Sequence, residues 1–176
     1  YNVTGTHNTL LGYEAGFGSS TYSHSDNTMV GHKAGTGVLG GASIVAVGAD
    51  ALEFNTAGSS TVAIGRQACR QDGSSNNVTN AANCVFIGRD SRASSATPTN
   101  QIVIGYEADG QGDNFATIGN ENITRVYMAH DGAAVMYANG TINTSDARFK
   151  KNVEDTDLGL SFINKIRPVK YDYKKN

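Results

Sequence analysis

Seven glycines anchor a repeat that extends over residues 8–122. A short apolar string precedes each glycine, and an alanine usually follows three residues after it. The anchors are Gly12, Gly31, Gly48, Gly65, Gly88, Gly105 and Gly119. Successive anchors lie 19, 17, 17, 23, 17 and 14 residues apart, and the recurrence of 17 argues against coincidence. Because a unit of this length cannot bury an apolar face alone, the repeats are expected to stack on one another as a solenoid.

The string before each glycine has the alternation of a short strand. The residue directly before the glycine is always aliphatic, and the residue two positions earlier in the chain is usually aliphatic or threonine. Side chains two apart share one face of a strand, so both columns are predicted to point into the solenoid. The glycine is expected at a bend with positive φ, and the alanine column is expected at a tight corner.

The column between them is then predicted to point outward, although most of its members are apolar. They are Leu10, Met29, Ala46, Ala63, Phe86, Val103 and Thr117. Apolar side chains on both faces of a strand are unusual on the outside of a monomer. Either this face packs against a neighbouring subunit, which we favour, or loops of the same chain cover it.

The repeated motif Val62, Ala63, Ile64, Gly65 followed by Ala68 resembles the repeats in the head domains of trimeric autotransporter adhesins. The resemblance covers roughly residues 8–122 and implies a parallel β-roll built from three chains. The coil spacing here is longer and less regular than in that family.

Composition limits the other classes of function. The chain has 21 glycines, two prolines, no tryptophan and a formal net charge of −2, which gives no reason to expect a nucleic-acid partner. No segment is long and apolar enough to insert into a membrane. No cofactor or metal site is predicted, because Cys69 and Cys84 read as buried thiols and the four histidines read as solvated side chains.

The glycine repeat ends before residue 123, and a charged segment begins near residue 145. Residues 123–144 alternate loosely around the turn signal Asp131 and Gly132, which predicts a β-rich neck with strands from three chains. Residues 145–176 have features of a helix, with Leu158 and Phe162 at helical spacing, followed by a short strand.

The charged segment contains two strings in a recognisable order. The first runs from Thr144 through Ser145 and Asp146 to Lys150, and the second is the Pro168, Val169 and Tyr171 pattern. Together they resemble the intramolecular chaperone of bacteriophage tail spikes and fibres, the endosialidase-type auto-processing family, over residues 144–176. In that family a Ser-Asp-x-Arg-x-Lys motif opens the chaperone, and the serine cuts the chain on its own N-terminal side.

The resemblance implies roles for four residues. Ser145 would be the nucleophile, Lys150 the base that accepts its proton, and Asp146 a positioning residue, with cleavage between Thr144 and Ser145. A serine hydroxyl is a weak nucleophile without a base, and a lysine serves as one where its pKa is lowered. On the residues alone, Thr144 to Asp146 is also an ordinary turn or helix cap.

The sequence therefore predicts a mainly-β protein with three parts. Residues 1–122 form a trimeric parallel β-solenoid, residues 123–144 a β-rich neck, and residues 145–176 the start of a small α+β chaperone domain. The expected function is a homotrimeric viral tail fibre or spike that binds a host-surface receptor, such as a glycan, through loops near residues 19–26 and 70–83.

Two alternatives remain. The first is a bacterial trimeric adhesin head at the cell surface, without proteolysis. The second, ranked last, is a single-chain solenoid enzyme such as a hexapeptide-repeat acyltransferase, whose six-residue period is absent here.

Overall fold

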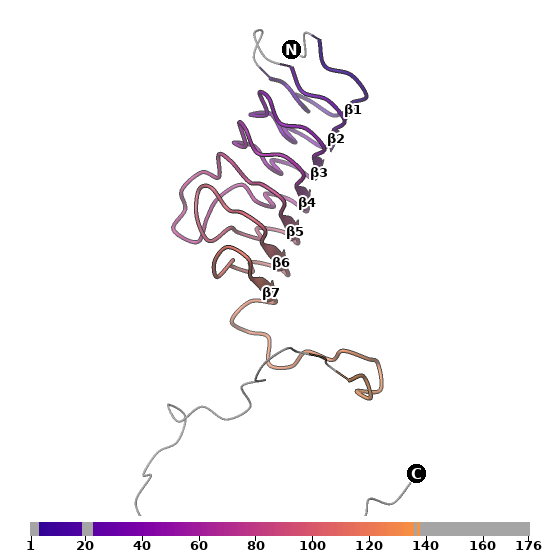
Figure 1. Cartoon of the computed structure of the whole chain (residues 1–176), viewed down its shortest axis with the longest axis vertical. Coiled ribbons are helices and arrows are strands. Elements are labelled where there is room, and N and C mark those ends of the chain that lie inside the picture. The colour runs from indigo at the N-terminus through magenta and orange to yellow at the C-terminus, as the bar shows by residue number, and fades with distance from the viewer. Residues whose placement is uncertain (1–3, 19–22, 136, 138–176) are drawn as a thin grey trace, which may run out of the picture. The chain divides into compact units, whose positions relative to one another are not determined.

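The computed structural model describes residues 4–18, 23–135 and 137. Within them the chain is all-β, and residues 4–126 form one compact unit. The unit is a β-solenoid with one three-residue strand per coil (Figure 1). The strands are β1 (Thr9–Leu11), β2 (Thr28–Val30), β3 (Val45–Val47), β4 (Val62–Ile64), β5 (Val85–Ile87), β6 (Ile102–Ile104) and β7 (Ala116–Ile118). They coincide with the strings before the seven anchor glycines, so the predicted parallel β-solenoid is confirmed.

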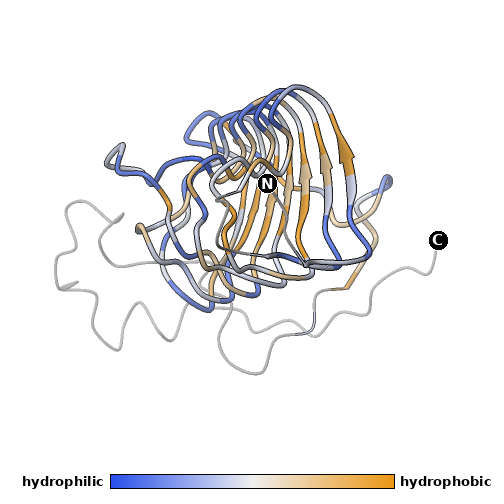
Figure 2. Cartoon of the chain, turned by 90° about the horizontal axis from the view of Figure 1, so that it is seen from above, coloured by the Kyte–Doolittle hydropathy of each residue, from blue (hydrophilic) through white to orange (hydrophobic). Residues whose placement is uncertain are grey.

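The strands stack in chain order into one parallel sheet. Each residue pairs with its equivalent in the next repeat, as Ile64 of β4 does with Ile87 of β5. This register follows the glycine frame even where the coil length changes, because the 23-residue step from β4 to β5 places its extra residues outside the strands. Figure 2, viewed along the stack, shows the strands side by side as an apolar band with more hydrophilic turns beside it.

The strand faces are the reverse of the prediction. The middle residue of each strand points into the coil, and Met29, Ala46 and Phe86 are completely buried there. The first and third residues point outward, and the Ile64 side chain remains 39% exposed. The inward side chains range in size from Ala46 and Ala63 to Phe86. The two uniform aliphatic columns lie on the outside instead.

The predicted roles of the glycine and alanine columns are confirmed. Gly65 has a φ of 133°, and a Cβ atom there would lie 2.5 Å from the carbonyl oxygen of Gly88 in the next coil. Only glycine satisfies both requirements. The alanines at the following corner, such as Ala51 and Ala68, are fully buried in the core.

A column of inward-facing side chains lies just before the strands and connects successive coils. The Asn8 Oδ1 atom accepts a hydrogen bond from the Asn27 N–H at 3.1 Å, and Asn27 Oδ1 accepts one from the Ile44 N–H at 2.9 Å. Further along, Thr61 Oγ1 and Cys84 Sγ accept in the same way from the coil that follows each. Backbone groups that turn away from the sheet ladder are thereby satisfied inside the coil.

One of the four histidines is not solvated. His24 is only 2% exposed; its Nε2 atom lies 3.1 Å from the Gly16 carbonyl oxygen and its Nδ1 atom 3.1 Å from Asn27 Nδ2. A neutral imidazole that donates from Nε2 and accepts at Nδ1 satisfies both contacts. His24 is therefore a buried structural residue of the second coil, which corrects the prediction.

The insertion in the longest coil is ordered and joins the stack. Asp72 accepts hydrogen bonds from the backbone N–H groups of Ser74 and Asn76, each at 2.9 Å, and this closes the loop. The Gly73 N–H then donates to the Ala93 carbonyl of the next coil at 3.0 Å. Burial alone would raise the pKa of Asp72, but hydrogen bonds from Asn76 and Ser74 bring it below the ordinary value.

The predicted neck is only partly covered by the structure. The described residues from 123 to 135 contain no strand in the single chain. Strands contributed by three chains were expected there, and one chain does not test that expectation. The predicted helix and strand of residues 145–176 lie outside the described residues. The described part of the chain contains no helix that could cross a membrane.

Candidate functional site

The four residues with predicted catalytic or cleavage roles lie outside the described residues. They are Thr144, Ser145, Asp146 and Lys150. The structure therefore neither brings these residues together nor separates them, and their roles stay predictions. The candidate surfaces that the structure does describe belong to the solenoid.

The first is the outward face of the sheet, which we call the outer sheet face. It consists of the first and third residues of β1 to β7. The first residues are Thr9, Thr28, Val45, Val62, Val85, Ile102 and Ala116, and the third residues are Leu11, Val30, Val47, Ile64, Ile87, Ile104 and Ile118. No strand residue carries a charge or an amide. The face is continuously aliphatic from β3 to β7.

Large side chains on this face remain open to solvent in the single chain. The exposed fractions are 42% for Ile102, 37% for Ile87 and 53% for Ile118. Strands that are apolar on both faces usually have both faces covered in the functional molecule. A contiguous exposed apolar area of this kind commonly marks an interaction site.

The second surface is the corner that follows the anchor glycines, which we call the charged corner. Its planar side chains stack between coils, since the rings of Tyr13 and His32 lie 5.5 Å apart at an angle of 14°. The Arg89 guanidinium lies 5.1 Å from the centre of the Tyr106 ring, and its Nε atom donates to Asp90 Oδ2 at 2.7 Å. The charged corner is thus a ladder of stacked aromatic and charged groups along the solenoid.

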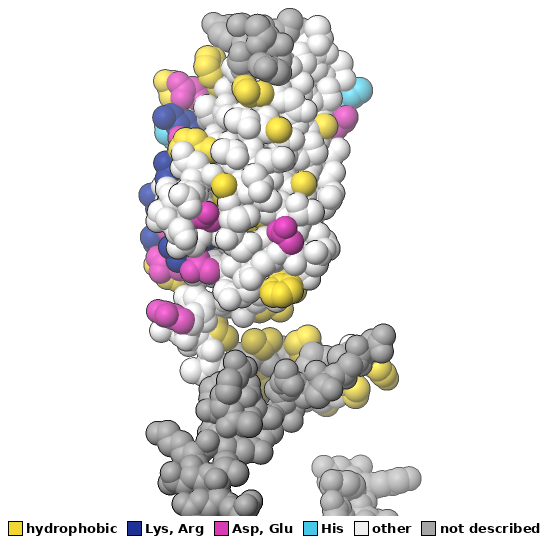
Figure 3. Space-filling model, turned by 60° about the vertical axis from the view of Figure 1, so that its left-hand side comes forward, with side chains coloured by type: hydrophobic (Ala, Val, Ile, Leu, Met, Phe, Trp, Pro, Cys, Tyr) yellow, Lys and Arg dark blue, Asp and Glu magenta, His cyan; other side chains and the backbone are white. Residues whose placement is uncertain are grey.

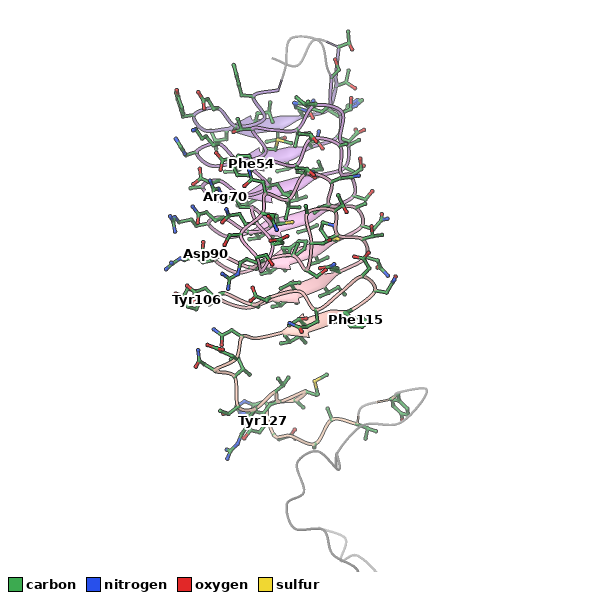
Figure 4. All side chains as sticks on the ribbon, turned by 90° about the vertical axis from the view of Figure 1, so that its left-hand side faces the viewer. Phe54, Arg70, Asp90, Tyr106, Phe115 and Tyr127 are labelled. Atoms are coloured by element: carbon green, nitrogen blue, oxygen red, sulfur yellow. The ribbon has the colours of Figure 1, made fainter. Side chains whose placement is uncertain are left out.

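Ion pairs between coils continue this pattern one step further around the turn. Arg70 Nε donates to Glu53 Oε2 at 2.5 Å, and the Arg70 guanidinium lies 4.9 Å from the centre of the Phe54 ring. Arg92 makes a two-pronged contact with Asp109 at 2.6 and 3.4 Å. Figure 4 shows Phe54, Arg70, Asp90 and Tyr106 down one margin of the stack, with Phe115 on the opposite margin. Charge is therefore concentrated at the turns, away from the outer sheet face.

The part of the surface seen in Figure 3 is largely turned away from the strands. It shows isolated apolar side chains among polar and backbone atoms, with charged groups gathered along one margin. Isolated apolar residues are normal on a protein surface.

A hollow of about 490 Å³ lies at the C-terminal end of the solenoid. Its lining includes Arg92, Glu107, Asp109 and Glu121, together with Thr117, which is the inward residue of β7. The hollow is therefore the open end of the coil stack. The Glu107 carboxylate raises the pKa of the neighbouring Tyr106 above its ordinary value.

The two cysteines are buried and are not joined in a disulfide. Burial raises the pKa of the Cys69 thiol well above its usual value, and the nearby Cys84 adds to the shift. A buried thiol of this kind is a poor nucleophile. The described residues also contain no group of three or more histidine, cysteine or carboxylate side chains that could hold a metal ion.

Sequence reasoning predicted an outward apolar strand face but assigned it to the wrong residues, and it missed the charged corner. It placed the aliphatic columns of the outer sheet face inside the coil, and it did not treat the positions after the glycines as a ladder. The signal for the charged corner was present, because Arg66, Arg89 and Tyr106 all directly follow an anchor glycine. The signal for the outer sheet face was that its two columns keep similar side chains from repeat to repeat, whereas the column between them varies in size.

Comparison with known families adds one finding. Residues 145–176 match the family described as chaperone of endosialidase. The match begins at Ser145, where the motif begins, and supports an intramolecular chaperone after the solenoid. No curated protein and no solved structure matches the chain significantly.

Proposed function

We propose that the chain is a segment of a homotrimeric bacteriophage tail fibre or spike that attaches the virion to its host. The observation that carries the proposal is the order of the parts: a chaperone-of-endosialidase match follows a rigid parallel β-solenoid with an uncovered apolar face. Trimeric β pairing joins residues of different chains, so it is non-local and slow. A chaperone that aligns three chains in register would remove much of that difficulty.

The proposed cleavage makes assembly irreversible. The Ser145 hydroxyl attacks the carbonyl carbon of Thr144 while Lys150, as the neutral amine, accepts the hydroxyl proton. The peptide C–N bond breaks, the released amine of Ser145 takes up a proton, and an ester joins the Thr144 carbonyl to Ser145 Oγ. Water then hydrolyses the ester, so that the solenoid ends at Thr144 and the chaperone begins at Ser145.

Attachment would use surfaces that a trimer leaves open. The ordered insertion at residues 70–83 and the charged corner both lie on the turns of a rigid scaffold, where binding residues are commonly found. A host-surface receptor, such as a glycan, would meet hydrogen-bonding groups and exposed aromatic rings there. Tyr13 and Tyr106 are 67% and 50% exposed.

The alternative is a bacterial trimeric adhesin head, which is supported by the repeated sequence motif around the anchor glycines. An adhesin of this kind would sit at the cell surface and would not cut itself. Cleavage therefore separates the two proposals.

The test is the intact mass, under denaturing conditions, of the chain expressed with whatever follows Asn176 in its gene. We expect two fragments that meet between Thr144 and Ser145. Ser145→Ala and Lys150→Ala should each abolish the cut, whereas Lys170→Ala, a lysine outside the motif, should leave it intact. A trimer that stays uncut would remove the protease and favour the adhesin.

A further inference from the structure

The outer sheet face has the dimensions of an interface. Its seven strands are joined by six spacings of about 4.8 Å, so the face is about 29 Å tall. It presents two side chains per rung over that height. Polar residues lie along one margin, where His7, Asp26, Ser43, Ser60, Asn83, Asn100 and Asn114 occupy left-handed corners before the strands. The charged corner forms the other margin. An apolar centre with a polar rim is the usual anatomy of a protein–protein interface.

The repeat of the face indicates what covers it. Each column offers the same type of side chain at every rung, so a matching surface must present groups at the same spacing over the whole height. A second copy of this solenoid has that spacing because its strands stack in the same way. The segment after residue 144 is rich in lysine, arginine and acidic residues and does not suit an uncharged aliphatic surface.

The composition of the face changes along the solenoid and sets the direction of packing. The first outward column begins with Thr9 and Thr28, continues through valines and reaches Ile102. If two copies pack in parallel, each strand lies opposite the same strand of the other copy, so side chains of the same type meet. An antiparallel arrangement about the middle strand would place β2 against β6, and thus the hydroxyl of Thr28 near Ile102.

We infer that the outer sheet face is buried against two further copies of this chain, with the solenoid axes parallel and the rungs at equal height. The inference rests on the proposed trimer and identifies the surface that forms it. The three sheets then enclose a dry core along the threefold axis, built from the first and third residues of the strands. The charged corners point outward and remain available to a receptor.

Disulfide cross-linking of the full chain tests the surface and the direction together. Ile104→Cys places a thiol on the outer sheet face of β6, and Tyr106→Cys, two residues further on, places the matched control at the charged corner. Both side chains are exposed in the single chain, at 36% and 50%. Cys69 and Cys84 are buried and common to both variants. After oxidation with a copper–phenanthroline complex, we expect a linked dimer band for Ile104→Cys and a monomer band for Tyr106→Cys.

Each outcome decides a different claim. A trimer by light scattering in which Ile104→Cys links no better than Tyr106→Cys would overturn the inferred surface and leave the trimeric fibre standing. Linkage only when Val30→Cys and Ile104→Cys chains are co-expressed would show antiparallel copies and overturn the direction. A chain that stays monomeric would overturn both the inferred surface and the proposed trimer.

Discussion

Buried polar side chains hold successive coils together from inside the solenoid. Asn55 is fully buried; its Oδ1 atom accepts a hydrogen bond from the Ala81 N–H at 2.9 Å, and its Nδ2 atom donates to the Gly58 carbonyl at 3.2 Å. Ala81 belongs to the next coil and is itself buried. One side chain thus closes a turn and connects two coils.

Asn55→Ala should destabilise the solenoid. It leaves the buried N–H of Ala81 without its acceptor, which costs about 1–3 kcal/mol in the free energy of unfolding. Chemical denaturation followed by circular dichroism measures the difference. Asn80→Ala, at an exposed asparagine, is the control and should change the free energy of unfolding by less than about 0.5 kcal/mol. Equal effects of the two substitutions would contradict this role of Asn55.

Residue-level roles could be predicted from the sequence only in part. The glycine and alanine columns follow directly from backbone and volume limits, and the structure confirms them. Asn55 and His24 could not be identified, because their burial depends on coils that close over them from distant parts of the chain. The inward and outward columns were interchanged because both are apolar and alternate with the same period.

The unit of this fold is a coil with its strand and several corner residues of positive φ. In the fourth coil Gly65 forms one corner directly after β4, and Gln67 has a φ of 58° two residues later. The corner lets the chain leave the sheet while the next coil stacks directly upon it. Residues with β-branched side chains could not occupy such positions without strain.

Gly65→Ala should destabilise the solenoid by roughly 2–4 kcal/mol, since it combines an unfavourable φ with a Cβ atom 2.5 Å from the Gly88 carbonyl oxygen. Gly40→Ala is the matched control, because a Cβ atom there would meet nothing within 4 Å. The melting temperatures of the two variants measure the contrast. If Gly65→Ala melted with or above Gly40→Ala, the stacking account of this corner would be wrong.

At the scale of elements the sequence was most informative. All seven strands could be located to the residue, because the glycine fixes the end of each and the apolar string its extent. The stacking of the insertion on the next coil could not be foreseen. It depends on the Asp72 loop and on the contact of Gly73 with Ala93, and neither repeats elsewhere among the residues that the structure describes.

For the whole molecule the outer sheet face is the dominant feature. A face that is continuously aliphatic from β3 to β7 is hard to reconcile with a monomer in water, whereas a trimer would bury it in a continuous core. Self-cleavage after assembly would release the chaperone, so the fibre could not refold into a trimer once it had unfolded.

The chemistry of residues 144–150 and the partner chains could not be derived from the solenoid. They depend on the family match at residues 145–176 and on contacts between copies, and a single chain contains no such contacts. The sequence does indicate where to look, because the motif at Ser145 and Lys150 stands apart from the repeats before it.

The most direct measurement is the native mass of the uncut Ser145→Ala chain by analytical ultracentrifugation over a range of protein concentrations. We predict three chain masses at every concentration, because a buried sheet core along the whole solenoid should not dissociate on dilution. A mass of one chain, with the outer sheet face open to water, would contradict the trimeric fibre.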